Sequence, residues 1–100
     1  MIELTKVQRR YLASEASKLK PVVMLGKEGP SDSLVGALNE ALGAHELVKV
    51  KFLDYKDQKR EIGEQLAQVT DASLVRLIGN MAIFYRPKAA PEDRRYRLPD

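Results

Sequence analysis

A chain of 100 residues, 44% of them hydrophobic, is long enough for one domain with a single small core. It contains no cysteine, which excludes disulfides, thiolate metal sites and thiol catalysis. No apolar run approaches the roughly 20 residues of a membrane-spanning helix, and the first residues lack the basic-then-apolar layout of a signal peptide. We therefore expect a cytoplasmic protein with no membrane partner.

The net charge is +3, and the charged residues are arranged in blocks along the chain. Residues 31–48 and 61–75 contain no Lys or Arg, whereas residues 1–30, 49–60 and 76–100 contain all of them. If the three basic blocks meet in space, they form a face suited to a polyanion. An ordinary solvated surface explains the same pattern equally well.

The first element predicted is a helix from Thr5 to about Leu19. Thr5 is suited to cap this helix, and Gln8, three residues later, completes a capping box. Lys20 and Pro21 end it, because the residue before a proline disfavours helical geometry. At helical spacing the apolar side chains gather on one side and the mostly basic ones on the other. The apolar side comprises Leu4, Val7, Tyr11, Leu12 and Leu19, and the opposite side comprises Lys6, Arg9, Arg10, Ala13, Ser17 and Lys20.

The uniformly apolar residues 22–25 predict a short strand that is buried on both faces and paired in parallel. A turn follows, made of Gly26, Lys27, Glu28 and Gly29, and is called the GKEG loop below. After it, a second helix is predicted from its N-cap Ser31 to about Leu42, with Gly43 as C-cap.

A strand, a Gly-x-x-Gly turn and a helix in succession can grip a nucleic-acid backbone. Glycine lacks Cβ, so a phosphate can approach the main chain closely. The helix start offers unpaired N–H groups and the positive end of its dipole. Lys27 adds a cation, whereas Glu28 places a negative charge where it should weaken contact with phosphate. The pattern alone is weak, since many strand-to-helix turns contain two glycines.

Residues 46–54 alternate as a strand does, with two lysines on one face, which marks that face as open to solvent or ligand. One face carries Val48, Val50 and Phe52, and the other carries Leu47, Lys49, Lys51 and Leu53. A third helix is predicted from its cap Asp57 to about Thr70, with Ile62, Leu66 and Val69 buried. Residues 74–78 and 81–86 are predicted as a hairpin around Gly79-Asn80.

Phe84 and Tyr85 are adjacent in the last strand, so one is predicted in the core and the other is available to stack on a base or to cover the sheet. Pro87 ends the strand. The folded domain is therefore predicted over residues 1–87, and residues 88–100 are predicted to be a charged C-terminal tail that is mobile or loosely docked. The order α-β-α-β-α-β-β predicts an α+β fold, a mixed four-stranded sheet with three helices packed against it.

Enzyme chemistry finds little support in these residues. The single histidine, His45, has no cysteine or carboxylate pair with which to form a metal site. Ser31 and Ser33 fit a helix start better than a nucleophile, since no base is in evident reach. We expect no catalytic residues, no metal site, no cofactor and no small-molecule substrate. RNA binding is the favoured function, and a protein-interaction module whose basic face binds an acidic partner is the alternative.

Four segments, in order over residues 4–87, resemble the chloroplast RNA splicing and ribosome maturation (CRM) domain family, in particular its bacterial stand-alone members of the YhbY type. They lie in the opening helix, the strand with its glycine loop, the second strand and the closing hairpin. The segments are Leu4-Thr5-Lys6-x-Gln8-Arg9-Arg10-Tyr11-Leu12, Val22-x-x-x-Gly26-Lys27-x-Gly29, His45-Glu46-Leu47-Val48-Lys49-Val50-Lys51 and Ile78-Gly79-x-x-x-x-Phe84-Tyr85-Arg86-Pro87.

The resemblance implies a fold like the C-terminal domain of translation initiation factor 3. It also implies RNA binding and, for bacterial members, association with ribosomal RNA in precursors of the large ribosomal subunit. The contacts are expected at the glycine loop and on basic surface near it. The expected RNA-binding residues are Gly26, Lys27, Glu28, Gly29, Lys6, Arg9, Arg10, Lys49, Lys51 and Arg86. Pro30 departs from the family pattern, where an aliphatic residue is more common, and should stiffen the exit of the loop.

Overall fold

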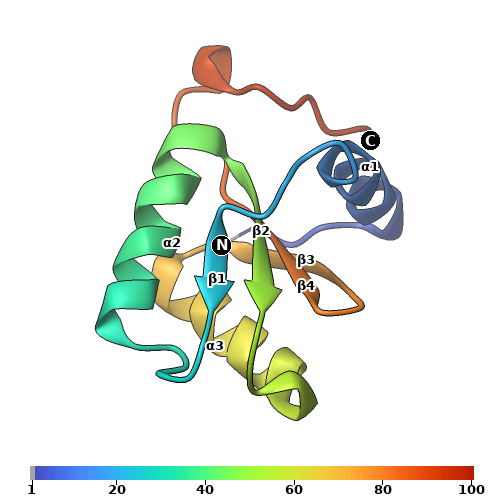
Figure 1. Cartoon of the computed structure of the whole chain (residues 1–100). Coiled ribbons are helices and arrows are strands. Elements are labelled where there is room, and N and C mark those ends of the chain that lie inside the picture. The colour runs from blue at the N-terminus through green and yellow to red at the C-terminus, as the bar shows by residue number, and fades with distance from the viewer. Residues whose placement is uncertain (1) are drawn as a thin grey trace.

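The computed structural model describes residues 2–100, in which three α-helices accompany a four-stranded mixed sheet (Figure 1). The elements occur in the predicted order, so the α+β fold is confirmed. Their bounds are α1 Lys6–Ala16, β1 Val23–Leu25, α2 Asp32–His45, β2 Leu47–Phe52, α3 Lys59–Thr70, β3 Ser73–Ile78 and β4 Met81–Tyr85. Short 3-10 helices cover Lys56–Gln58 and Pro91–Asp93. The likeness to translation initiation factor 3 stays a prediction.

The sheet has the strand order β1-β2-β4-β3. β1 pairs in parallel with β2, as predicted, and β4 is antiparallel to both of its neighbours. The hairpin that joins β3 and β4 turns at Gly79, whose φ of 56° is the left-handed geometry such a turn requires. β1 therefore lies at one edge of the sheet, with one side of its backbone unpaired.

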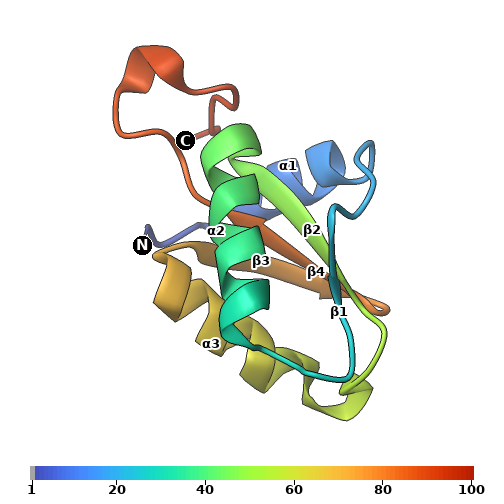
Figure 2. The same ribbon diagram turned by 60° about the vertical axis from the view of Figure 1, so that its left-hand side comes forward.

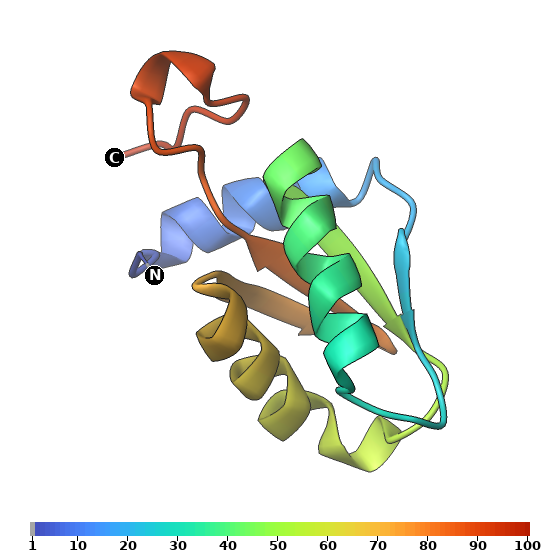
Figure 3. The ribbon, with the colours of Figure 1, turned by 90° about the vertical axis from the view of Figure 1, so that its left-hand side faces the viewer.

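The helices cover both faces of the sheet (Figures 2 and 3). α2 and α3 pack on one face over a core that includes Leu38, Phe52 and Phe84. α1 packs on the other face, where its Leu12 meets Tyr85 in a second, smaller cluster. Both Phe84 and Tyr85 are almost fully buried, so neither aromatic ring is available to stack on a base.

α1 begins as predicted, with a complete capping box. The Gln8 N–H donates to the Thr5 hydroxyl (3.1 Å), and the Gln8 side-chain oxygen accepts from the Thr5 N–H (3.0 Å). The predicted apolar side is partly wrong, because Val7 is exposed and Ala13, assigned to the basic side, is buried. The helix presents small residues to the sheet, which lets its backbone approach the strands closely.

The prediction that residues 22–25 are buried on both faces is wrong. Val23 and Leu25 face the core, but Val22 and Met24 are 56% and 48% exposed. α1 does not extend over this edge of the sheet, so one face of β1 stays open (Figure 1). Apolar content alone could not distinguish a central strand from an edge strand.

The ends of the other helices differ from the prediction in detail. Ser31 caps α2 as expected, but the helix continues through Gly43, and Glu46 is its C-cap with a φ of 64°. α3 starts at Lys59 after a 3-10 turn, so Asp57 does not cap it. Val69 on α3 is 57% exposed instead of buried. No helix within residues 2–100 is long and apolar enough to cross a membrane.

The C-terminal tail, residues 88–100, lies against the domain. Tyr96 and Leu98 pack on the α1 cluster, and the Gln8 side-chain amide donates to the carbonyl oxygen of Pro99 (3.0 Å). The two carboxylate oxygens of Glu46 accept from the backbone N–H groups of Lys88 (2.7 Å) and Arg95 (2.6 Å). The mobility predicted for this tail stays a prediction, and its docked position is defined by these contacts.

Candidate nucleic-acid interface

The GKEG loop is a tight turn between β1 and α2. The Gly29 N–H donates to the Gly26 carbonyl oxygen (3.0 Å), and the Ser31 N–H donates to the Gly29 carbonyl oxygen (2.8 Å). These bonds place Lys27 and Glu28 at the tip, where both side chains are exposed. The turn thus presents one cation, and one anion beside it, directly before the first turn of α2.

Tyr55, which follows β2, holds this loop in place. Its hydroxyl donates to the carbonyl oxygen of Lys27 (2.7 Å). Its ring lies against Gly29, which has a φ of 66°, and a Cβ added there would stand 3.2 Å from a ring carbon. Gly29 is therefore required twice, by its backbone angle and by the space that Tyr55 occupies. Tyr55 could not be predicted from the sequence, because no local pattern indicates a contact between residues 28 positions apart.

A groove of about 510 Å³ runs beside the loop, along the edge strand and the start of α2. Its walls include Val22, just before β1, Met24 of β1, and Ser33 and Ala37 of α2. The Ser31 hydroxyl accepts from the Leu34 N–H (3.2 Å). The N–H groups of Asp32 and Ser33 lie in the first turn of α2, where backbone donors have no partner within the helix and can bind an anion. Such a groove has the chemistry to hold a phosphate-bearing strand.

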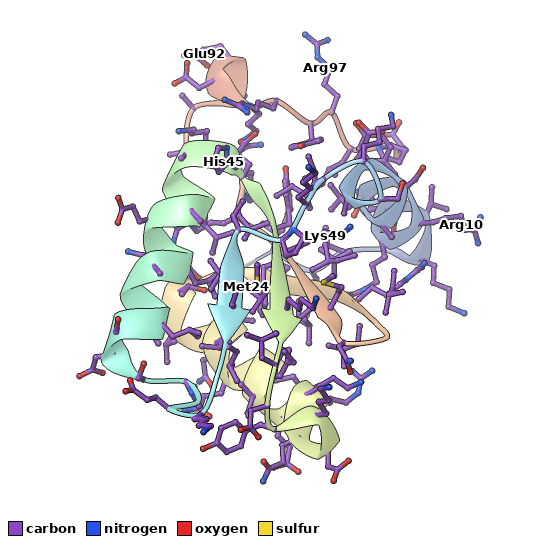
Figure 4. All side chains as sticks on the ribbon, in the orientation of Figure 1. Arg10, Met24, His45, Lys49, Glu92 and Arg97 are labelled. Carbon is purple, nitrogen blue, oxygen red and sulfur yellow. The ribbon has the colours of Figure 1, made fainter. Side chains whose placement is uncertain are left out.

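Three other predicted cations, on β2 and on α1, remain exposed. Lys51 is exposed on β2, where it pairs with Met24 of β1. Lys6 and Arg10 are exposed on α1, across the sheet from α2, and Arg10 points away from the sheet in Figure 4. Lys56, which the sequence analysis did not select, is exposed in the turn directly after Tyr55.

Three other predicted cations are held by the protein itself. The Arg9 guanidinium donates to the carbonyl oxygens of Leu74 and Val75 at 2.6 and 2.9 Å, which ties α1 to β3. Lys49 donates to the Leu19 carbonyl oxygen (2.9 Å).

Arg86 donates to the carbonyl oxygens of Asn39 (3.0 Å) and Thr70 (2.8 Å), so it joins α2 to the end of α3. Asn39 lies eight residues beyond Ser31, or about 12 Å along the helix axis, which separates Arg86 from the GKEG loop. The structure therefore brings Lys27 together with Tyr55 and the groove, and it does not bring Arg86 there. The RNA-binding roles given to these side chains stay predictions.

The fold and the loop together define a class: a small α+β domain built on a strand, a Gly-x-x-Gly turn and a helix. Residues 4–86 match the family model of the CRS1 / YhbY (CRM) domain. The chain belongs to this family.

Relatives match over almost their full length. The chain is 36% identical over 97 residues to the probable RNA-binding protein YqeI of Bacillus subtilis, covering 96% of this chain and 99% of that protein. It is 34% identical over 100 residues to an RNA-binding protein of Haemophilus influenzae, covering 99% of this chain and 98% of that one. The solution structure of the hypothetical protein SAV1595 from Staphylococcus aureus superposes with a TM-score of 0.81 at 34% identity, over 97% of this chain and all of that one.

Proposed function

We propose that this protein binds RNA and that the GKEG loop and the adjoining groove hold the RNA backbone. The names of its relatives support RNA as the ligand. The observation that carries the site is the bond from the Tyr55 hydroxyl to the Lys27 carbonyl oxygen, which restrains the loop. A restrained loop loses less conformational entropy when it binds a ligand.

The electrostatics of the loop are mixed. Lys27 attracts phosphate, whereas Glu28 and Asp32 stand close to it in the sequence and oppose that attraction. The loop alone therefore supplies modest affinity, and Lys51 and Lys56 on the neighbouring elements add to it. Binding of this kind is largely electrostatic and weakens with salt.

The proposed target is ribosomal RNA in precursors of the large subunit, bound in the cytoplasm during ribosome assembly. The family resemblance of residues 4–87 supports this target. The exposed, backbone-directed chemistry of the loop is consistent with it, since a phosphate grip carries no sequence information by itself.

A charge reversal at the loop tests the site. Lys27→Glu is expected to lower the affinity for a labelled single-stranded RNA about tenfold and to reduce the slope of log affinity against log salt by about one. Fluorescence anisotropy at several salt concentrations measures both quantities. Arg97→Glu, which makes the same charge change at an exposed position in the tail, is the matched control. Equal losses in the two variants would contradict a role for the loop.

A further inference from the structure

A second cavity, of about 200 Å³, lies between the C-terminal end of α1, the start of β2 and the tail. It is smaller than the pockets of drug-sized ligands and has the scale of a single planar ring system. Four of its lining side chains are basic or ionisable to a cation, namely Lys20, His45, Lys49 and Arg95. The rest are apolar or aromatic, namely Leu19, Val22, Leu47, Val48 and Tyr96.

The charge of this pocket has one sign. Among residues 2–100, no carboxylate lines it. The nearby Glu46 is fully buried, and its two oxygens are occupied by the backbone N–H groups of Lys88 and Arg95. Both carboxylate oxygens are thus engaged by backbone donors of the tail, and the same bonds fix Arg95 as part of the wall.

Tyr96 supplies an aromatic wall that is held in place. Its ring packs edge-on against Tyr85, with ring centroids 6.4 Å apart and planes at 83°. Lys49 is held as well, by its bond to the Leu19 carbonyl oxygen. Figure 4 shows Lys49 on β2 and His45 at the end of α2, on the two elements that flank the cavity. An apolar floor, a fixed aromatic ring and a cationic rim are the features that bind an unpaired base and its phosphate.

The pocket continues the groove of the GKEG loop. Val22 lines both the groove and the pocket, so the two meet along the edge strand. From Gly26 back to Lys20 the chain spans six residue steps, or about 20 Å if extended. A Gly-x-x-Gly loop clamps about four nucleotides of backbone, so an RNA strand that leaves the loop along β1 reaches the pocket.

We infer that this pocket, called here the Tyr96 pocket, takes an unpaired base of the RNA strand whose backbone lies at the GKEG loop. The inference rests on the proposed function and extends it, because it requires the bound RNA to be single-stranded at this position. Arg95 and Lys20 contact the phosphate next to the base, and Tyr96 contacts the base itself.

A titration of the nitrogen- and carbon-labelled full chain with a uridine oligonucleotide of about eight nucleotides, followed by NMR, tests both sites at once. We expect the amide signals of Gly26–Gly29 and those of Val22, His45 and Arg95 to shift together. An abasic oligonucleotide of the same length, which offers phosphates without bases, is expected to shift the loop signals and to leave Tyr96 side-chain signals unchanged.

Binding by charge-reversed variants gives an independent measurement. Arg95→Glu and Lys20→Glu are each expected to weaken binding of the uridine oligonucleotide about tenfold. Arg97→Glu is the matched control, since Arg97 lies in the same tail, does not line the pocket and points away from the domain (Figure 4). Tyr96→Leu keeps an apolar side chain against the α1 cluster and is expected to lose the base contact while the fold is retained.

The outcomes separate this inference from the proposed function. Shifts at the loop without shifts at the pocket would overturn the Tyr96 pocket and leave RNA binding at the loop intact. Equal effects of Arg95→Glu and Arg97→Glu, or equal Tyr96 shifts with the abasic strand, would also overturn it. Shifts at the pocket alone would support the pocket and overturn the loop, and no shift at either site would overturn both.

Discussion

At the scale of single residues, the loop depends on a contact between Tyr55 and the GKEG turn. Tyr55 itself has a left-handed φ of 55°, and its N–H is held by the Asp54 carboxylate (2.7 Å). This geometry directs the ring toward Gly29 and the hydroxyl toward the Lys27 carbonyl oxygen. The loop shape is therefore set by a residue that follows the neighbouring strand β2, as well as by its own glycines.

The two glycines of the loop should differ in their tolerance of alanine. Gly29→Ala is expected to lower the free energy of unfolding by about 1–2 kcal/mol, because the left-handed backbone is strained for an L residue and because the added Cβ meets Tyr55. Gly26→Ala is the matched control, since a Cβ there meets nothing within 4 Å and its φ is not left-handed. Urea denaturation of both variants measures the difference, and equal stabilities would contradict the brace.

At the scale of elements, local signals predicted most of the fold. The Thr5 capping box, the Ser31 cap and the Gly79-Asn80 turn each involve residues within three positions of one another, and each is confirmed. Some failures are local, such as the caps expected at Gly43 and Asp57. The burial of β1 depends instead on where α1 ends over the sheet, and the bonds of Arg9 and Arg86 to carbonyl groups far away in sequence could not be predicted from local signals.

The contacts that dock the tail could not be predicted from the sequence. Its anchor is Glu46, whose left-handed backbone ends α2 and whose carboxylate accepts two backbone N–H groups of the tail. Nothing in the local sequence distinguishes Glu46 from an exposed strand residue. Hydrogen bonds to a charged acceptor contribute about 1.5–3 kcal/mol each, so one side chain suffices to dock a segment with few apolar residues.

Removal of this anchor should free the tail. Glu46→Ala is expected to lower the free energy of unfolding by about 2 kcal/mol or more and to accelerate hydrogen exchange at the Lys88 and Arg95 amides. Glu40→Ala, at an exposed position of the same helix, is the control. Mass spectrometry of exchanged peptides provides the measurement, and unchanged exchange in residues 88–100 would show that other contacts hold the tail.

The contact between Tyr85 of β4 and Tyr96 of the tail predicts an alkaline limit to stability. Burial raises the pKa of Tyr85 and of Tyr96 above the usual value of 10.0, with the charges of Glu46 and Glu15 as smaller causes. A raised pKa in the folded state means that the neutral phenols favour folding. This contribution is complete below pH 10.0 and is lost as pH rises through the folded-state values. Denaturation midpoints from neutral to strongly alkaline pH should therefore fall more steeply for the wild type than for a variant with both tyrosines changed to Phe.

At the scale of the whole molecule, the cations do not form one continuous face. Lys27 and Lys56 lie at the loop end, Lys6 and Arg10 lie on α1 across the sheet, and Lys20 and Arg95 line the Tyr96 pocket. Such a distribution suits a ligand that wraps around the domain or is large compared with it. It also explains why the charge blocks in the sequence could indicate a polyanionic ligand but could not predict where on the surface that ligand lies.

The proposed ribosomal RNA target predicts how the protein sediments. Tagged protein in a cell lysate is expected to migrate with large-subunit precursors at low salt and to return to the top of a sucrose gradient at high salt, because counterions compete for the phosphates. Lys27→Glu should shift this return to a lower salt concentration. Exclusive migration at the top at low salt would count against ribosomal RNA and would favour a smaller RNA or an acidic protein.

The open edge of β1 also bears on how copies of this protein avoid one another. An unpaired strand edge with exposed apolar side chains invites pairing with the same edge of a second copy, the first step of many aggregates. Here the strand is only three residues long, and Pro21, which has no N–H to donate, precedes it closely. The edge of β1 is therefore too short to hold a neighbouring chain, so it can stay open for the RNA strand that we propose there.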